Sequence, residues 1–191
     1  PERAGELNGI TKVLSVVPVA TTQSLRLIDT VANHFACNPW DVIRSAIPPR
    51  VGSVDKQFNL NENQLRSSGK YMVEFQILAP FIQAHEQVAS LVQNCHESGS
   101  VLVVAPDEKD VDLIIQALSV CHLKTLKLTA AMPREERYRN YLAAMHGDRS
   151  IVVGTRSAIF APINDLRTII VHKESAFDHY EVRSPGWNTR T

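Results

Sequence analysis

The chain has 191 residues, 44% of them hydrophobic, which suits one domain of ordinary size or slightly more, with a real core. Lys and Arg number 20, as do Asp and Glu, so no global charge points to nucleic acid or membrane, and a nucleic-acid contact would need a local patch. No apolar run approaches the roughly 18 residues that a membrane helix needs. The chain opens without Met or a signal-peptide pattern, so we expect a cytoplasmic piece of a longer protein.

The first 49 residues predict a small, mainly helical α+β segment. The stretch ITKVLSVVP, residues 10–18, predicts a strand that ends at Pro18. A helix capped by Thr21 or Thr22 follows, because apolar residues recur at helical spacing: Leu25, Ile28, Ala32 and Phe35. A shorter helix is expected at residues 40–46.

The rest of the chain predicts a linker and then an α/β fold. Residues 50–70 are polar and carry scattered Gly, Ser and Asn without a period, which is typical of a linker. From residue 71 to 191, strands alternate with helices that carry clean apolar stripes. Five strands are expected, at residues 72–78, 101–105, 124–129, 150–154 and 167–171. This order predicts a mostly parallel sheet with helices on both faces, whose functional residues follow the C-terminal ends of the strands.

The stretch GTRSAIFAP, residues 154–162, is the most distinctive motif. Gly154 would allow a tight turn after a strand, Thr155 and Ser157 could donate hydroxyls, and Ser157 could cap a short helical turn. Arg156 would then be held at the functional edge, where it suits a phosphate of a nucleic-acid backbone. The alternative is that Arg156 only ties the loop down through an acid such as Asp165 or Glu174.

The last strand ends where a nucleotide hydrolase would carry acids for a metal, yet here it runs into His172, Lys173, Glu174 and Ser175. A cation beside a magnesium site is electrostatically unfavourable. The only candidate phosphate loop, SSGK at residues 67–70, has one Gly and precedes the first strand, so it is not placed to bind a nucleotide. We therefore predict that the motif at 172–175 is a degenerate ATPase motif with no catalytic residues.

The remaining titratable residues indicate no metal centre. Cys37, Cys95 and Cys121 lack the spacing of metal ligands and are expected to be buried free thiols in a reducing compartment. The seven histidines show no ligand spacing either. A nucleophile and base set for a small-molecule enzyme is not found.

Several stretches resemble the PriA family of bacterial replication-restart helicases (primosomal protein N-prime). RSIVVGTRSAIFAPINDLRTIIV, SGSVLVVAPDE and MPREERYRNYLAAMHGDRS resemble the first motor lobe, and ELNGITKVLSVVP through VANHFACNPWDVIRSAIPPR is similar to the N-terminal domain. The resemblance implies the latter part of a 3′-end DNA-binding-like domain at 1–49, a linker at 50–70, and a degenerate RecA-like helicase lobe at 71–191. Active members carry Asp-Glu-Glu-His where this chain carries His172 to Ser175, so the chain resembles a branch that lacks helicase motifs.

The resemblance implies a cytoplasmic, nucleoid-associated protein of replication restart. We expect it to recognise forked or branched DNA and to scaffold primosome proteins in a non-enzymatic role, with no membrane partner. DNA contacts are expected at Gly154, Thr155, Arg156 and Ser157, with Lys12 as a basic residue of the N-terminal domain. We expect no cofactor in this chain; the family's zinc-binding cysteine cluster would follow Thr191. The alternative is an active ATP-dependent 3′-to-5′ DNA helicase whose catalytic parts lie outside this chain.

Overall fold

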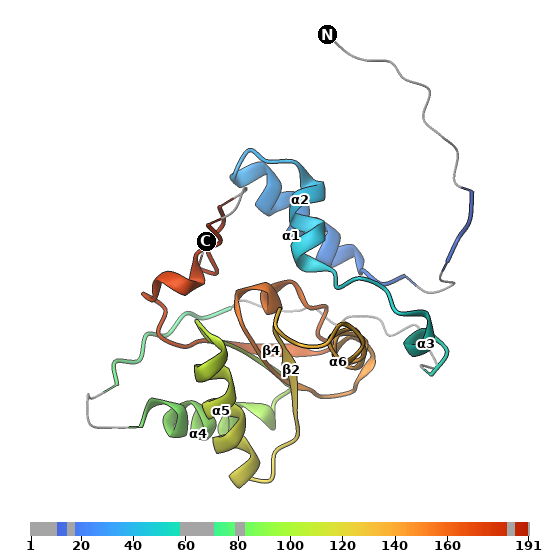
Figure 1. The fold of residues 1–191 in the computed structure, drawn as a ribbon. Helices are drawn as coiled ribbons and strands as arrows, with labels where there is room; N and C mark the ends of the chain where they lie inside the picture. Colours follow the sequence, from blue (N-terminus) through green and yellow to red (C-terminus); the bar gives the residue numbers. More distant parts are fainter. Residues whose placement is uncertain (1–10, 15–17, 58–70, 79–82, 183–185, 191) are drawn as a thin grey trace.

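A computed structural model describes residues 11–14, 18–57, 71–78, 83–182 and 186–190 (Figure 1). The helices are α1 (Thr22–His34), α2 (Pro39–Ala46), α3 (Gly52–Asp55), α4 (Ala84–His96), α5 (Glu108–Val120) and α6 (Arg134–His146). The strands are β1 (Ser100–Val104), β2 (Thr125–Leu128), β3 (Ile151–Gly154) and β4 (Leu166–Val171). Two 3₁₀ turns, η1 (Arg156–Phe160) and η2 (Phe177–His179), follow β3 and β4.

The four strands form one parallel sheet in the order β2-β3-β1-β4. Val104 at the end of β1 pairs with Gly154 on one side and with Val171 on the other. The predicted parallel α/β fold is therefore confirmed, because every strand pair of this sheet runs in the same direction.

Helices cover both faces of the sheet. On one face α4 and α5 pack against Val101, Val103, Ile151 and Val153, and they lie together below the sheet in Figure 1. On the other face α6, α3 and η1 pack against Leu102, Val104, Leu128 and Val152. Strands buried on both faces explain the uninterrupted apolar runs of β1 and β3.

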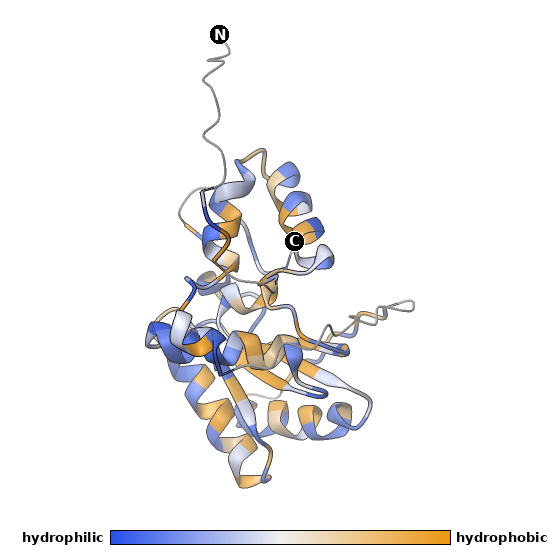
Figure 2. Ribbon diagram, turned by 90° about the vertical axis from the view of Figure 1, so that its right-hand side faces the viewer, coloured by the Kyte–Doolittle hydropathy of each residue, from blue (hydrophilic) through white to orange (hydrophobic). Residues whose placement is uncertain are grey.

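The N-terminal helices form a third cluster beside the sheet. Thr21 caps α1, because its hydroxyl accepts a hydrogen bond of 3.1 Å from the backbone N–H of Ser24. The buried faces of α1 and α2 pack against Phe160 of η1 and against Trp187. Figure 2 shows this pattern as apolar residues on the inner sides of the helices and polar residues on their outer sides. The N-terminal helices thus share a core with the residues that follow β3.

Two expected strands have no counterpart among the residues that the structure describes. Residues 71–78 include the expected strand 72–78, but they carry no secondary structure and are largely exposed. Of the expected strand 10–18, residues 11–14 and Pro18 are described and lie outside any strand, and the remainder falls outside the described residues. The expected linker 50–70 contains one short helix, α3, and residues 58–70 lie outside the described part.

No helix within the described ranges is both long enough and apolar enough to cross a bilayer.

Candidate nucleic-acid interface

The parallel sheet brings the ends of β1, β3 and β4 to one edge. The backbone N–H of Ala105 donates to Gly154 O at 2.9 Å, and the N–H of His172 donates to Val104 O at 2.9 Å. Residues after Ala105, Gly154 and Val171 consequently meet at the same edge, as the parallel arrangement predicts.

Gly154 is required here because two groups approach its Cα closely. The backbone conformation is not the reason, since its φ lies outside the left-handed region. A Cβ at this position would lie 2.2 Å from Leu128 O of β2 and 2.6 Å from the Cβ of Ala158. Gly154 is buried, so it would support a nucleic-acid contact through the position of the following turn.

Thr155 and Ser157 are half-buried in the turn after Gly154. Thr155 is the residue that begins the 3₁₀ turn, and its carbonyl accepts a 2.8 Å hydrogen bond from Ala158 N–H. Ser157 lies inside the turn, so the expectation that Ser157 caps it was wrong. The cap falls two residues earlier because the helical turn begins directly after the end of β3.

Arg156 is tied to the segment that follows η2. Its Nε and Nη2 donate to Glu181 Oε2 at 3.1 and 3.0 Å, and its Nη1 donates to the Asp178 carbonyl at 3.2 Å. The acids considered from the sequence were Asp165 and Glu174, whereas the partner is Glu181. The Arg156 side chain keeps 31% of its surface exposed, so the guanidinium is oriented by these bonds and still reaches solvent.

Lys173 occupies the strand end where a metal-binding acid was expected, and it forms an ion pair. Its Nζ lies 2.7 Å from both Oδ1 and Oδ2 of Asp110, which is on the first turn of α5 and only 7% exposed. Lys173 thus neutralises the Asp110 carboxylate at this strand end. The ion pair therefore replaces a negative site with a neutral one.

The other residues of the degenerate motif have structural partners or are exposed. His172 is 5% exposed, and burial lowers its pKa, against a raising effect of Asp110. Glu174 pairs with Arg190 at 3.2 Å, and Ser175 is exposed in the turn. Across the described ranges, no group of three His, Cys, Asp or Glu side chains is arranged to hold a metal ion. The motif offers no pair of free carboxylates for magnesium.

Lys12 is not brought to this edge. It lies in the exposed segment 11–14, and no hydrogen bond or ion pair in the described part of the chain joins it to the turn after β3. A DNA contact by Lys12 remains a prediction, and it would belong to a different surface from Arg156.

Two aromatic residues at the same edge were missed from the sequence. Phe177 and Tyr180 stack with ring centroids 6.3 Å apart and planes at 15°, and both rings are exposed, at 72% and 49%. They follow β4 after the turn at residues 172–176. Phe177 begins η2 and Tyr180 comes directly after it, on the segment whose Asp178 carbonyl holds Arg156. The sequence signal for them was two aromatic residues, three positions apart, downstream of a predicted strand end. Exposed aromatic faces beside cations suit stacking on bases.

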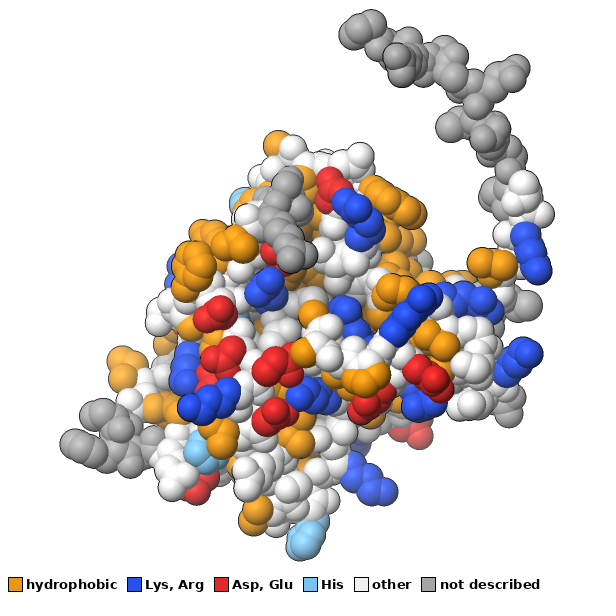
Figure 3. Space-filling model, in the orientation of Figure 1, with side chains coloured by type: hydrophobic (Ala, Val, Ile, Leu, Met, Phe, Trp, Pro, Cys, Tyr) orange, Lys and Arg blue, Asp and Glu red, His pale blue; other side chains and the backbone are white. Residues whose placement is uncertain are grey.

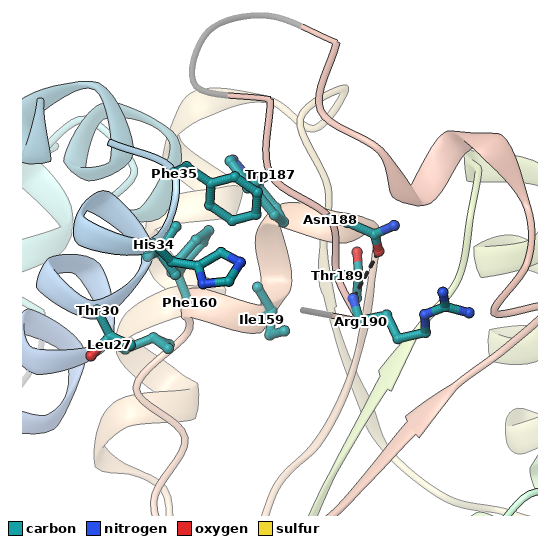
Figure 4. Close-up of a pocket in the computed structure, with 11 residues that line it drawn as sticks. Leu27, Thr30, His34, Phe35, Ile159, Phe160, Trp187, Asn188, Thr189 and Arg190 are labelled. Atoms are coloured by element: carbon teal, nitrogen blue, oxygen red, sulfur yellow. Dashed lines mark hydrogen bonds between the residues drawn. The ribbon is translucent and has the colours of Figure 1, made fainter. Parts of the chain in front are cut away.

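A pocket of about 240 Å³ lies between α1, η1 and the C-terminal residues (Figure 4). Its walls include the apolar side chains Leu27, Phe35, Ile159 and Phe160, with Trp187 and Arg190 opposite α1. Trp187 is 2% exposed, and its Nε1 has no hydrogen-bond partner among the described residues. Phe160 and Trp187 meet edge to face at 5.0 Å, which fixes the back of the pocket.

The surface around these features carries both signs of charge. Figure 3 shows Lys and Arg interspersed with Asp and Glu over the face turned to the viewer, without a large patch of one sign. Any nucleic-acid affinity of this face would therefore depend on a few positioned contacts and not on a broad positive field.

Comparison with known proteins places the chain beside replication restart proteins. It is 29% identical over 206 residues to a probable replication restart protein PriA of Mycobacterium tuberculosis, covering 95% of this chain and 32% of that protein. The corresponding protein of Mycobacterium leprae is 28% identical over 212 residues, with 96% of this chain and 33% of that protein covered. Replication restart protein PriA of Helicobacter pylori is 28% identical over 102 residues, or 53% of this chain and 16% of that protein.

The similarity to PriA inferred from the sequence motifs is thereby confirmed, although no family model matches the chain. The chain spans about a third of the length of the mycobacterial relatives that it matches.

Proposed function

We propose that this chain serves replication restart as a DNA-contacting and scaffolding lobe that does not use ATP. It would bind forked or branched DNA at the edge formed by the turn after β3 and by η2, and it would offer its surface to primosome proteins. The names of its relatives support the replication-restart part of this proposal.

The observation that carries the non-enzymatic part is the ion pair between Lys173 and Asp110. The strand end that would need free carboxylates for a metal ion holds the Lys173 ammonium at 2.7 Å from the buried carboxylate of Asp110. Binding magnesium there would require displacing this ammonium, and two cations in one confined site repel each other. The stretch from 78 to 86 also lacks the Gly and Lys of a phosphate loop.

DNA contact at the same edge is supported by the turn after β3 and by its neighbours. Arg156 is pre-oriented by Glu181 and by the Asp178 carbonyl, with part of its guanidinium open to solvent. A pre-oriented guanidinium can make a bidentate contact to a phosphate. Phe177 and Tyr180 supply exposed rings for stacking on unpaired bases beside it.

Arg156→Ala tests this proposal. We expect weaker binding of forked DNA and a salt dependence of the binding constant that is shallower by about one unit, because one phosphate contact is lost. The measurement is fluorescence anisotropy of labelled forked DNA at several salt concentrations, with thermal melts of the same proteins.

Arg139→Ala is the matched control. Arg139 is also an arginine in an ion pair, with Glu135 at 2.8 Å, but it lies on α6 and on neither strand-end turn. This variant should keep the affinity and the salt slope of the unmodified protein. If Arg156→Ala keeps both as well and only lowers the melting temperature, Arg156 is a structural tie to Glu181 and the DNA contact is wrong.

A further inference from the structure

The carboxylate of Glu181 occupies one edge of the Arg156 guanidinium. Its Oε2 accepts hydrogen bonds from Nε at 3.1 Å and from Nη2 at 3.0 Å, so both bonds end on the same oxygen. The Glu181 side chain is only 15% exposed, against 31% for Arg156. The arginine of the proposed DNA contact is therefore already paired with an anion of this chain, and the pair carries no net charge.

The donors of Arg156 show how much of the guanidinium is left for DNA. A guanidinium carries five N–H groups, two on each Nη and one on Nε. Glu181 accepts from Nε and from Nη2, and the Asp178 carbonyl accepts from Nη1 at 3.2 Å. One N–H on each Nη remains, which is enough for a bidentate contact to a phosphate.

A phosphate bound to the remaining N–H groups would lie beside the Glu181 carboxylate. The two anions would occupy adjacent edges of one guanidinium, about 5 Å apart, which is inside the Debye length of about 8 Å at physiological salt. Like charges at this distance repel, and the partial burial of Glu181 limits the screening by solvent. A phosphate that took the Nε edge instead would have to displace Glu181. In both cases the negative charge of Glu181 opposes DNA at Arg156.

The neighbouring acids are not in the same position. Glu174 pairs with Arg190 at 3.2 Å, and Asp178 bonds Arg156 through its main-chain carbonyl, which carries no net charge. Among the described residues, Glu181 is the one carboxylate that forms an ion pair with Arg156. The opposing charge at this guanidinium can therefore be assigned to a single side chain.

We propose that Glu181 is an autoinhibitory residue of the DNA-binding edge: its carboxylate holds Arg156 in place and at the same time lowers the affinity of this arginine for a DNA phosphate. The inference rests on the proposed function, because it requires that Arg156 contacts DNA. Holding the guanidinium needs only a hydrogen-bond acceptor, whereas the inhibition needs the negative charge. A neutral acceptor at position 181 would therefore keep the orientation and remove the inhibition.

Glu181→Gln separates the two effects, because glutamine has nearly the same shape and its Oε1 can accept the bonds from Nε and Nη2. We expect this variant to bind labelled forked DNA about two- to fivefold more tightly than the unmodified protein, which is the size of effect that partly exposed charge pairs have. Fluorescence anisotropy at low and at high salt measures the affinities. The gain should shrink as the salt concentration rises, because salt screens the repulsion.

Two further variants are the controls. Glu135→Gln removes the same charge from an ion pair elsewhere, with Arg139 at 2.8 Å on α6, and should leave the affinity for DNA unchanged. Glu181→Gln combined with Arg156→Ala should bind no more tightly than Arg156→Ala alone, because the carboxylate acts through this guanidinium. Thermal melts of all variants establish that each one is folded.

The outcomes separate this inference from the proposed function. If Arg156→Ala weakens binding but Glu181→Gln does not strengthen it, the DNA contact stands and Glu181 only positions Arg156, so the inference is wrong. An equal gain from Glu181→Gln in the Arg156→Ala protein, or from Glu135→Gln, assigns the effect to the general charge of the protein and also overturns the inference. If neither Arg156→Ala nor Glu181→Gln changes the affinity, the DNA contact at Arg156 is itself wrong and the inference fails with it.

Discussion

At the scale of single residues, Lys173 combines an unfavourable backbone conformation with a favourable side-chain contact. Its φ is +50°, in the left-handed region that residues with a Cβ rarely adopt. This conformation is compatible with the ion pair to Asp110, whose carboxylate is only 7% exposed. A strained backbone at a strand end is often functional. Here the contact is structural, because it compensates a largely buried carboxylate.

Lys173→Ala should lower the free energy of unfolding by about 1–3 kcal/mol, because it leaves the Asp110 carboxylate without its charged partner. Alanine also carries a Cβ, so the backbone cost stays and the change reports the ion pair. Urea unfolding measures the effect, with the exposed Lys124→Ala as the matched control, expected to change stability by less than about 0.5 kcal/mol. If Lys173→Ala is as stable as the control, the ion pair contributes nothing and Lys173 is free for another role.

His172 should make the protein less stable in mild acid. Burial lowers the pKa of His172 in the folded protein, and Lys173, His179 and His85 act in the same direction, against Asp110. The unfolded chain therefore takes up this proton first as the pH falls below about 6.5, the usual histidine value, and stability falls with it.

Thermal melts from about pH 7.5 to pH 5 measure this effect, and His172→Gln should flatten the decline. An equal decline in His172→Gln would assign the acid sensitivity to other groups.

Residue identity predicted the interface only in part. The sequence indicated that Gly154 to Ser157 follow a strand end, and the structure places them there. It did not indicate that Gly154 is needed for the close approach of Leu128 O, or that Arg156 pairs with Glu181, 25 residues later. Such contacts depend on how β2 and the segment after η2 pack, which local patterns do not encode.

At the scale of elements, helices were predictable because their signals are local. Thr21 caps α1 as expected. Asp107 caps α5, because its Oδ1 accepts from Asp110 N–H at 2.8 Å. The prediction of a strand at 72–78 was wrong for this structure, because alternation of apolar and polar residues shows only that a segment can form a strand. Whether it pairs depends on an available edge, which is a property of the whole sheet.

Helix α6 makes contacts that the periodicity of its apolar residues does not predict. Tyr138 and Tyr141 of this helix are both buried. Their hydroxyls also donate hydrogen bonds, from Tyr138 to Asp55 Oδ1 at 2.7 Å and from Tyr141 to the Val19 carbonyl at 2.9 Å. Burial raises the pKa of both tyrosines, so the hydroxyls stay protonated as donors. These bonds tie α3 and the start of the N-terminal helices to the sheet through one helix.

At the scale of the molecule, two clusters of buried residues meet at the turn after β3. Ala158 belongs to the cluster on the α6 face, and Phe160 belongs to the cluster of α1 and α2. A segment of five residues thus joins the sheet to the N-terminal helices, next to the edge where Arg156 lies.

The whole chain is expected not to bind ATP. A nucleotide site on a parallel sheet needs a phosphate loop after one strand and acids after another. The sequence lacks the phosphate loop between residues 78 and 86. At the strand end where the acids would lie, Lys173 forms an ion pair with Asp110. We therefore expect no saturable change in anisotropy when the protein is titrated into a fluorescent ATP analogue with magnesium. Lys70→Ala removes the lysine of the single Gly-Lys pair and should give the same flat titration. Magnesium-dependent binding that persists in Lys70→Ala would reveal a nucleotide site of a different construction and would return the active helicase to consideration.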